Sequence, residues 1–193
     1  MAGAANTQER ILDLAQQYIQ ERGYNGFSFR DLASCVGVKS SSIHYYYANK
    51  THLALAVTSR YRKNFAAATA QLREEIPSAP DLLKAYAKIF KSTLEDGKKV
   101  CLCVMLASDR DSVEDSVTDQ VRAFFADQYR WLSGVITNGI SQGTIRDNIR
   151  PDDFAVLFFS ALEGAMMVAN AKGNSADIEL VANQMIELVQ SDP

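Results

Sequence analysis

Apolar residues recur at helical spacing along almost the whole chain, and no segment shows the period-two alternation of a half-buried strand. The first such segment has its apolar face at Ile11, Leu12, Ala15, Tyr18 and Ile19. Asn6 or Thr7 is expected to cap this helix, and Gly23 to end it. The periodicity predicts an all-α fold.

The same pattern divides the rest of the chain into helices of different lengths. Two short helices are expected near residues 29–36 and 40–46, a long one at 50–75, and later ones near 82–94, 117–140, 154–169 and 178–189. Pro77 and Pro80 break the pattern, which makes them the clearest internal boundary after the first fifty residues.

Composition limits the class of protein. The longest apolar runs in the 193 residues fall short of the roughly 20 that a membrane span requires, and the N-terminus lacks a secretory signal. We therefore expect a cytoplasmic chain without a membrane partner, whose three cysteines are reduced thiols. Residues 1–50, here called the head, carry five basic and four acidic side chains, whereas the rest of the chain, the body, carries 15 basic and 19 acidic ones. A phosphate-binding surface is therefore more compatible with the charge of the head than with that of the body.

A helix-turn-helix is indicated by three positions in the head. Two short helices that cross closely need a small residue in the first, a turn residue tolerant of positive φ, and an aliphatic residue in the second that points back into the core. Ala33, Gly37 and Ile43 meet these needs in order. Residues 40–46, SSSIHYY, then form the recognition helix that enters the major groove of DNA.

The polar richness of this stretch fits a surface that meets DNA. Serine hydroxyls at a helix start let the backbone approach phosphate, and tyrosines offer flat apolar area with a hydroxyl at the tip. Lys39 and Lys50 supply positive charge on either side. The alternative is a capped helix on a tyrosine-rich surface turn.

Residues 23–53, GYNGFSFRDLASCVGVKSSSIHYYYANKTHL, resemble the DNA-binding head of the TetR family of bacterial transcriptional regulators nearly position for position. In that resemblance Tyr47 takes the place of a core Phe, and Lys50 that of a phosphate-contacting lysine. Ser41 departs from a usual Gly and His44 from a common Tyr, so base-reading details are not carried over. The implied DNA-binding residues are Ser28, Lys39, Ser40, Ser41, Ser42, His44, Tyr45, Tyr46 and Lys50.

The resemblance also implies partners. Family members are homodimers that bind a palindromic operator in double-stranded DNA, and a small molecule bound in the helical body alters the separation of the two heads. Residues 142–169 and the terminal helix look like the two helices that form the family's four-helix interface. The alternative for the apolar helix at 154–169 is a central position in a monomer. We thus expect a DNA-binding domain at 1–50 and a ligand-binding and dimerisation domain at 51–193.

Aromatic, sulfur and acidic side chains of the body are candidates for the effector site. Glu163 interrupts an apolar run, where a carboxylate has to bind the ligand or pair with Arg122 or Arg130. The candidate ligand-binding residues are Tyr86, Phe90, Cys101, Met105, Phe125, Tyr129, Glu163 and Met167. Packing in the core is the alternative for each of them.

Cys101 has two readings. It resembles a sensing thiol in TetR-family members that respond to electrophiles, and Lys98 and Lys99 beside it would favour the thiolate. Val100, Leu102, Val104 and Met105 suggest a packed thiol instead. The cysteine and histidine spacing predicts no metal site.

The sequence thus predicts a regulator, most simply a repressor released by an effector, with no cofactor and no catalytic residues. The alternatives are a thiol-sensing regulator acting through Cys101, an enzyme that uses a cysteine, and a helical adaptor without a DNA role. Neither Cys101 nor Cys103 has a histidine and an acid nearby in sequence, and an adaptor would leave residues 40–46 unexplained.

Overall fold

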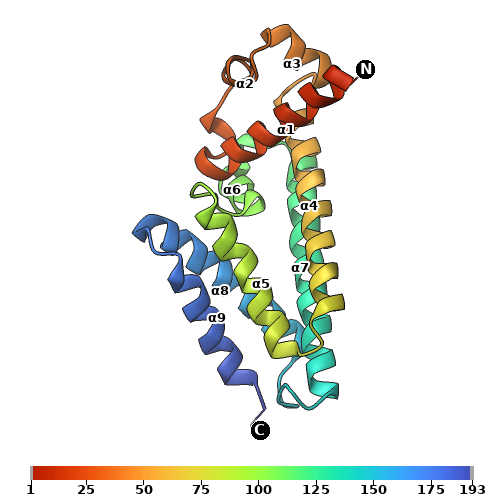
Figure 1. Ribbon diagram of the computed structural model, residues 1–193, viewed down its shortest axis with the longest axis vertical. Coiled ribbons are helices and arrows are strands. Elements are labelled where there is room, and N and C mark those ends of the chain that lie inside the picture. The colour runs from red at the N-terminus through yellow and green to blue at the C-terminus, as the bar shows by residue number, and fades with distance from the viewer. Residues whose placement is uncertain (1, 192–193) are drawn as a thin grey trace. The chain divides into compact units, whose positions relative to one another are not determined.

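The computed structural model describes residues 2–191 and confirms the all-α fold (Figure 1). In chain order the helices are α1 (Ala2–Arg22), α2 (Phe29–Val36), α3 (Ser40–Tyr46), α4 (Lys50–Glu75), α5 (Ala79–Glu95), α6 (Leu102–Ser108), α7 (Asp115–Ser141), α8 (Pro151–Lys172) and α9 (Ala176–Val189). Short 3₁₀ helices cover Tyr24–Gly26 and Arg110–Ser112. Within the described residues, β-pairing is limited to an isolated bridge between Ile145 and Gln190.

Some helix starts differ from the expected ones. α1 begins at Ala2 rather than after a cap at Asn6 or Thr7, because the alanines before these residues are strong helix formers. Pro80 lies in the first turn of α5, where a missing N–H group costs little, so it begins a helix instead of separating two. α6 was not predicted, because a seven-residue apolar segment is too short to reveal its period.

The chain forms two compact units. The first contains the described residues up to Lys63 together with Cys101–Ala123, and the second contains Asn64–Val100 and the described residues from Phe124 onward. α4 and α7 each contribute to both units. The predicted functional boundary at residue 50 lies within the first unit, and the separate roles of 1–50 and 51–193 stay predictions.

The first unit is built around α1, which packs against α2 and α6 (Figure 1). α2 and α3 pack on each other and form the helix-turn-helix. Ala33 is buried at the crossing, Gly37 adopts φ +78° and donates its N–H to the Ala33 carbonyl at 2.9 Å, and Ile43 is fully buried. The three needs inferred from the sequence are therefore met by these residues.

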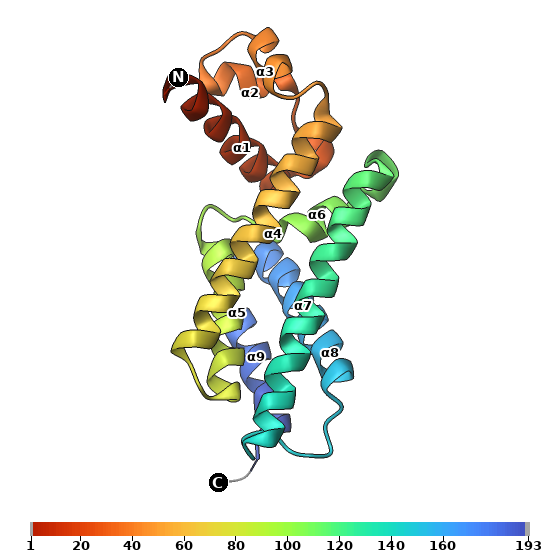
Figure 2. The same cartoon turned by 90° about the vertical axis from the view of Figure 1, so that its right-hand side faces the viewer.

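In the second unit α5, α8 and α9 pack against one another, as both views of the chain show (Figures 1 and 2). Aromatic rings fill its core, and Tyr86 contacts Phe65, Phe90 and Phe158 at centroid distances of 5.9, 5.4 and 6.5 Å. The Tyr86 hydroxyl donates a buried hydrogen bond of 3.1 Å to Gln128 Oε1. This polar pair lies among the aromatic rings of the interior, where Thr69 and Glu163 are also buried.

α8 is both long and apolar. By length and composition it alone there meets the criteria for a membrane span, and 50% of its most apolar window is buried. The core helix of a water-soluble protein meets the same criteria. Large apolar side chains remain exposed on α8 and α9: Val156, Leu157, Met167, Val168, Leu180 and Leu188.

Candidate nucleic-acid interface

α3 presents one polar face to solvent and one apolar residue to the core. Ser40, Ser41 and His44 are exposed, and Tyr45 has 84% of its surface accessible. Ser42 and Tyr46 are half-buried, and the Tyr45 and Tyr46 rings meet edge to face at 5.2 Å. Because Ile43 anchors the helix, the polar side chains keep a fixed direction outward.

His44 is held in place by neighbours in the head. Its ring lies 4.9 Å from the Phe29 ring, and Nδ1 is 3.3 Å from the Ala48 carbonyl oxygen. These contacts orient the exposed imidazole before any ligand is present. Its predicted role in base reading stays a prediction.

Tyr47 follows α3 and is only 5% exposed. Burial raises the pKa of its phenol, and the Gln8 side-chain amide approaches the hydroxyl at 3.5 Å. It therefore occupies a core position, as the resemblance to a family with Phe at this place implied.

Ser28 caps α2 through a reciprocal pair with Asp31. The Asp31 N–H donates to the Ser28 hydroxyl at 3.3 Å, and the Ser28 N–H and hydroxyl both donate to the Asp31 carboxylate at 2.7 Å. The hydrogen bond from the Ser28 hydroxyl, followed by that from its backbone, lowers the pKa of Asp31. The predicted phosphate contact at Ser28 thus belongs to a residue that also fixes the start of α2.

Lys50 lies differently from the expectation. Its half-buried ammonium group donates to the Phe27 carbonyl and lies 4.8 and 4.2 Å from the ring centroids of Tyr24 and Phe27. Burial lowers the pKa of Lys50, and the negative charge of Asp109 partly opposes that shift. In this conformation the ammonium faces the turn after α1, whereas Lys39 is exposed at the start of α3.

Asp109 was not anticipated from the sequence. Its carboxylate accepts the N–H of Tyr24 at 2.6 Å and so holds the turn that Lys50 also contacts. The two residues are 85 positions apart, and an aspartate after a short apolar segment carries no signal for such a contact.

Five of the predicted ligand-binding residues lie in the second unit and inside it or at its margin. Tyr86 and Phe90 are buried, Phe125 and Tyr129 each contact the Phe159 ring at 5.8 and 5.5 Å, and Glu163 is 7% exposed. Met167 is in the same unit but 40% exposed, so it does not line that interior. Arg122 and Arg130, considered as partners of Glu163, bind Asp119 and Asp127 on their own helix.

Cys101 and Met105 belong to the first unit. Cys101 and Cys103 are buried, with 3% and 0% of their surface exposed, whereas Cys35 is exposed and its sulfur lies 2.9 Å from the Tyr18 hydroxyl. Burial favours the packing interpretation of Cys101 over a readily accessible thiol.

The chain is similar to known regulators over almost its full length. It is 25% identical over 197 residues to the HTH-type transcriptional regulator CymR of Pseudomonas putida, covering 97% of this chain and 91% of that protein. A TetR-family regulator structure from Agrobacterium tumefaciens matches with 30% identity and a TM-score of 0.93, covering 97% of this chain and 100% of the other. One from Legionella pneumophila matches with 32% identity and a TM-score of 0.86, covering 95% and 97%.

Two family models also match. Residues 11–57 match the bacterial regulatory proteins of the tetR family, and residues 79–185 match the tetracyclin repressor-like C-terminal domain. The first match contains the helix-turn-helix with its exposed α3 face, and the second extends from α5 into α9. The chain therefore belongs to the TetR family of DNA-binding transcriptional regulators.

Proposed function

We propose that the protein is a homodimeric repressor that binds a palindromic operator through α3 and leaves it when a small molecule binds the second unit. It acts in the cytoplasm, where its DNA lies. The observation that carries this proposal is the exposed polar face of α3, which Ile43 holds against the core of the head. Two such helices in a dimer would enter successive major grooves, about 34 to 36 Å apart.

Lys39, just before α3, and the exposed side chains of α3 itself have different roles in this proposal. Lys39 neutralises phosphate on any sequence, whereas Ser42, His44 and Tyr45 contact base edges or thymine methyl groups. Ser28, Ser40, Ser41, Tyr46 and Lys50 complete the DNA-contacting set. Because Tyr45 is 84% exposed, its truncation removes a DNA contact with little effect on the core.

Selection of bound sequences from random duplex DNA tests this function. The wild type should enrich a palindrome, and Tyr45→Ala should weaken its binding about tenfold, since a good base contact is worth about 1–3 kcal/mol. Ser116→Ala, at an exposed position of α7 in the same unit, is the matched control and should bind normally. Equal binding to all sequences by the wild type would contradict an operator-specific regulator.

The dimer is supported by the apolar surface of α8 and α9. Val156, Leu157, Val168, Leu180 and Leu188 are each at least 46% exposed, which is unusual for so many large apolar side chains on adjacent helices. A two-fold axis would bury the same surface of both copies, as closed homodimers do. In sedimentation analysis Leu180→Glu should shift the protein towards monomer, whereas Ala67→Glu on the exposed side of α4 should not.

The effector site is supported by the polar pair inside the second unit. Tyr86 and Gln128 provide a hydroxyl and an amide among Phe65, Phe90 and Phe158, which is the composition of many small-molecule sites. A ligand that binds one conformation of the body better than the other would shift the population of DNA-competent dimers. Loss of operator binding on adding the effector, absent in Gln128→Leu, would identify this interior as the site.

A further inference from the structure

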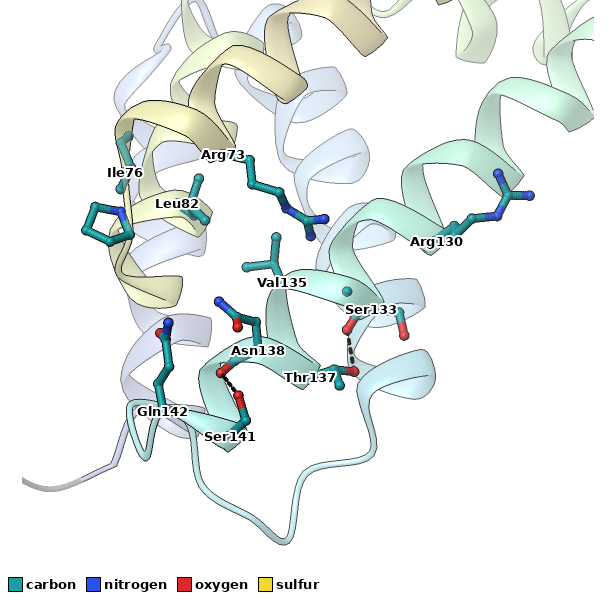
Figure 3. A pocket seen from close by; sticks show the side chains of 12 residues that line it. Arg73, Ile76, Leu82, Arg130, Ser133, Val135, Thr137, Asn138, Ser141 and Gln142 are labelled. Atoms are coloured by element: carbon teal, nitrogen blue, oxygen red, sulfur yellow. Dashed lines mark hydrogen bonds between the residues drawn. The ribbon is translucent and has the colours of Figure 1, made fainter.

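A cleft of about 750 Å³ opens in the second unit where the end of α4 and the start of α5 meet the C-terminal half of α7 (Figure 3). This volume is within the usual range of small-molecule sites. None of the eight residues predicted to bind an effector lines it. We propose that this cleft binds a small organic carboxylate, with its charged group at Arg73 and its apolar part against Ile76, Leu82 and Val135.

The charge of the cleft favours an anion. Its lining contains Arg73 and Arg130 and no acidic residue. Among residues 2–191, Arg130 pairs only with Asp127, one turn away on α7, at 3.1 Å, and 76% of its side chain is exposed. Such solvent-exposed pairs contribute little, so the Arg130 guanidinium remains available to a ligand.

Arg73 is positioned by the protein but not neutralised by it. Its guanidinium lies 5.6 Å from the Trp131 ring centroid and donates to the Trp131 carbonyl at 3.4 Å. It forms no ion pair with any carboxylate in the described part of the chain. Since guanidinium presents its N–H groups as a planar fork, a carboxylate is its best-matched partner.

Gly134 makes room for this arrangement. A Cβ atom added there would lie 3.0 Å from Arg73 Nη2, closer than an ordinary van der Waals contact. Glycine is unfavourable inside a helix such as α7, and here its missing side chain lets the guanidinium lie against the helix. The cleft thus has a place built for the positive charge.

Further donors continue along the same wall. Asn138 lies in the last turn of α7 and Gln142 directly follows this helix, and both side chains line the cleft (Figure 3). Neither side-chain amide makes a hydrogen bond within residues 2–191. Asp152, which does not line the cleft, accepts a hydrogen bond from the Ser133 hydroxyl at 2.5 Å and pairs with neither arginine in the described chain.

The apolar side chains of the cleft favour an organic acid over inorganic phosphate. Ile76 and Leu82 extend from the end of α4 and from α5, and Val135 comes from α7. A ligand of the matching chemistry has a planar anionic group at one end and a compact hydrocarbon body. An inorganic anion would make no use of these apolar contacts.

Trp131 reports directly on the site, because it is the only tryptophan in the chain and its ring lies beneath Arg73. We would titrate the purified full-length protein, without DNA, with cyclohexanecarboxylate and follow the tryptophan emission. The neutral cyclohexanecarboxamide has the same shape, and inorganic phosphate has the charge without the apolar body. Because no DNA is present, failure here leaves the proposed operator binding untouched.

A saturable emission change with cyclohexanecarboxylate is expected, with at least tenfold weaker binding of the carboxamide and of phosphate. Arg73→Gln should weaken carboxylate binding at least tenfold, and Gly134→Ala should weaken it by displacing the guanidinium. Arg150→Gln is the matched control, because Arg150 forms an exposed pair with Asp153 and does not line the cleft.

Because Arg73→Gln also changes the surroundings of Trp131, its binding is checked by calorimetry, and its fold by circular dichroism. Folded Arg73→Gln protein with wild-type affinity would overturn the proposal. So would equal binding of the acid and the amide, or tighter binding of phosphate.

Discussion

Gly23 and Asp109 approach so closely that a Cβ atom on Gly23 would lie 2.6 Å from Asp109 Oδ2. Gly23 also has φ +77°, a conformation that other residues adopt only with strain. The absent side chain lets the carboxylate reach the N–H of Tyr24, which is buried. The turn after α1 is therefore fixed by a residue that follows α6.

Asp109→Ala should lower the free energy of unfolding by about 1–3 kcal/mol, because the buried Tyr24 N–H loses its charged acceptor. Gly23→Ala should cost at least as much, since it adds both strain and a clash. Urea denaturation measures both. Asp111→Ala, in the exposed 3₁₀ turn that follows, is the control and should change stability by less than about 0.5 kcal/mol. An unchanged Asp109→Ala midpoint would show that water replaces the carboxylate.

Lys50→Met should separate DNA binding from stability. The folded-state pKa of Lys50 is lowered by burial, so the cost of holding the ammonium is fully present below that pKa and is relieved as pH rises from it to the unfolded-state value. Removing the charge relieves this cost and also loses the Phe27 hydrogen bond, so we expect a stability change within about 1 kcal/mol.

Operator affinity of Lys50→Met should nevertheless fall, and the slope of log affinity against log salt should drop by about one, since one phosphate contact is lost. Lys39→Met, at an exposed lysine, should show the same DNA effect with unchanged stability. An unaltered salt slope in Lys50→Met would mean that its ammonium stays on the Phe27 carbonyl when DNA binds.

Ser28→Ala should destabilise the head by about 0.5–2 kcal/mol through loss of the α2 cap. The pKa of Asp31 is lowered mainly by the Ser28 hydroxyl, so this contribution is present above the ordinary carboxyl pKa and is lost as pH falls through the folded-state value. An NMR titration should therefore show a higher pKa for Asp31 in Ser28→Ala. The stability difference from wild type should shrink in acid, and Ser34→Ala on the exposed side of α2 should change neither quantity.

The three thiols should react with Ellman's reagent at different rates. Cys35 is exposed and should react first, whereas Cys101 and Cys103 are buried and should react only when the structure opens. Cys35→Ser should abolish the fast phase, and denaturant should restore rapid reaction of the remaining two. A fast phase that persists in Cys35→Ser but is lost in Cys101→Ser would favour the thiol-sensing alternative.

Local signals made the helix-turn-helix predictable. The bounds of α3 and α4 match the expected 40–46 and 50–75, because Gly37 ends α2 and Asn49 caps α4 by accepting the His52 N–H at 2.9 Å. The crossing of α2 and α3 was also predictable from two residue types. The small Ala33 lets the two helices approach, and the aliphatic Ile43 turns its side of α3 toward the core, and both are buried.

The direction of Lys50 was not predictable in the same way. It depends on Tyr24 and Phe27, which reach it through the packing of the head, and on Asp109, 85 residues from Tyr24. The cleft at Arg73 was missed for a related reason: its donors are ordinary surface residues of α4, of α7 and of the turn after α7, and only the approach of α4 to Gly134 brings them together.

The first unit consists of two separate stretches of the chain, which affects how DNA-binding heads can be exchanged between related proteins. A chimera joined at residue 50 would pair a foreign Gly23–Tyr24 turn with the recipient's own Asp109, two partners never selected together. Exchange of DNA specificity between relatives is then easiest by substitution on the α3 surface. A transplanted head is expected to bring residues 101–123 with it, so the portable unit of this protein consists of two stretches of its gene.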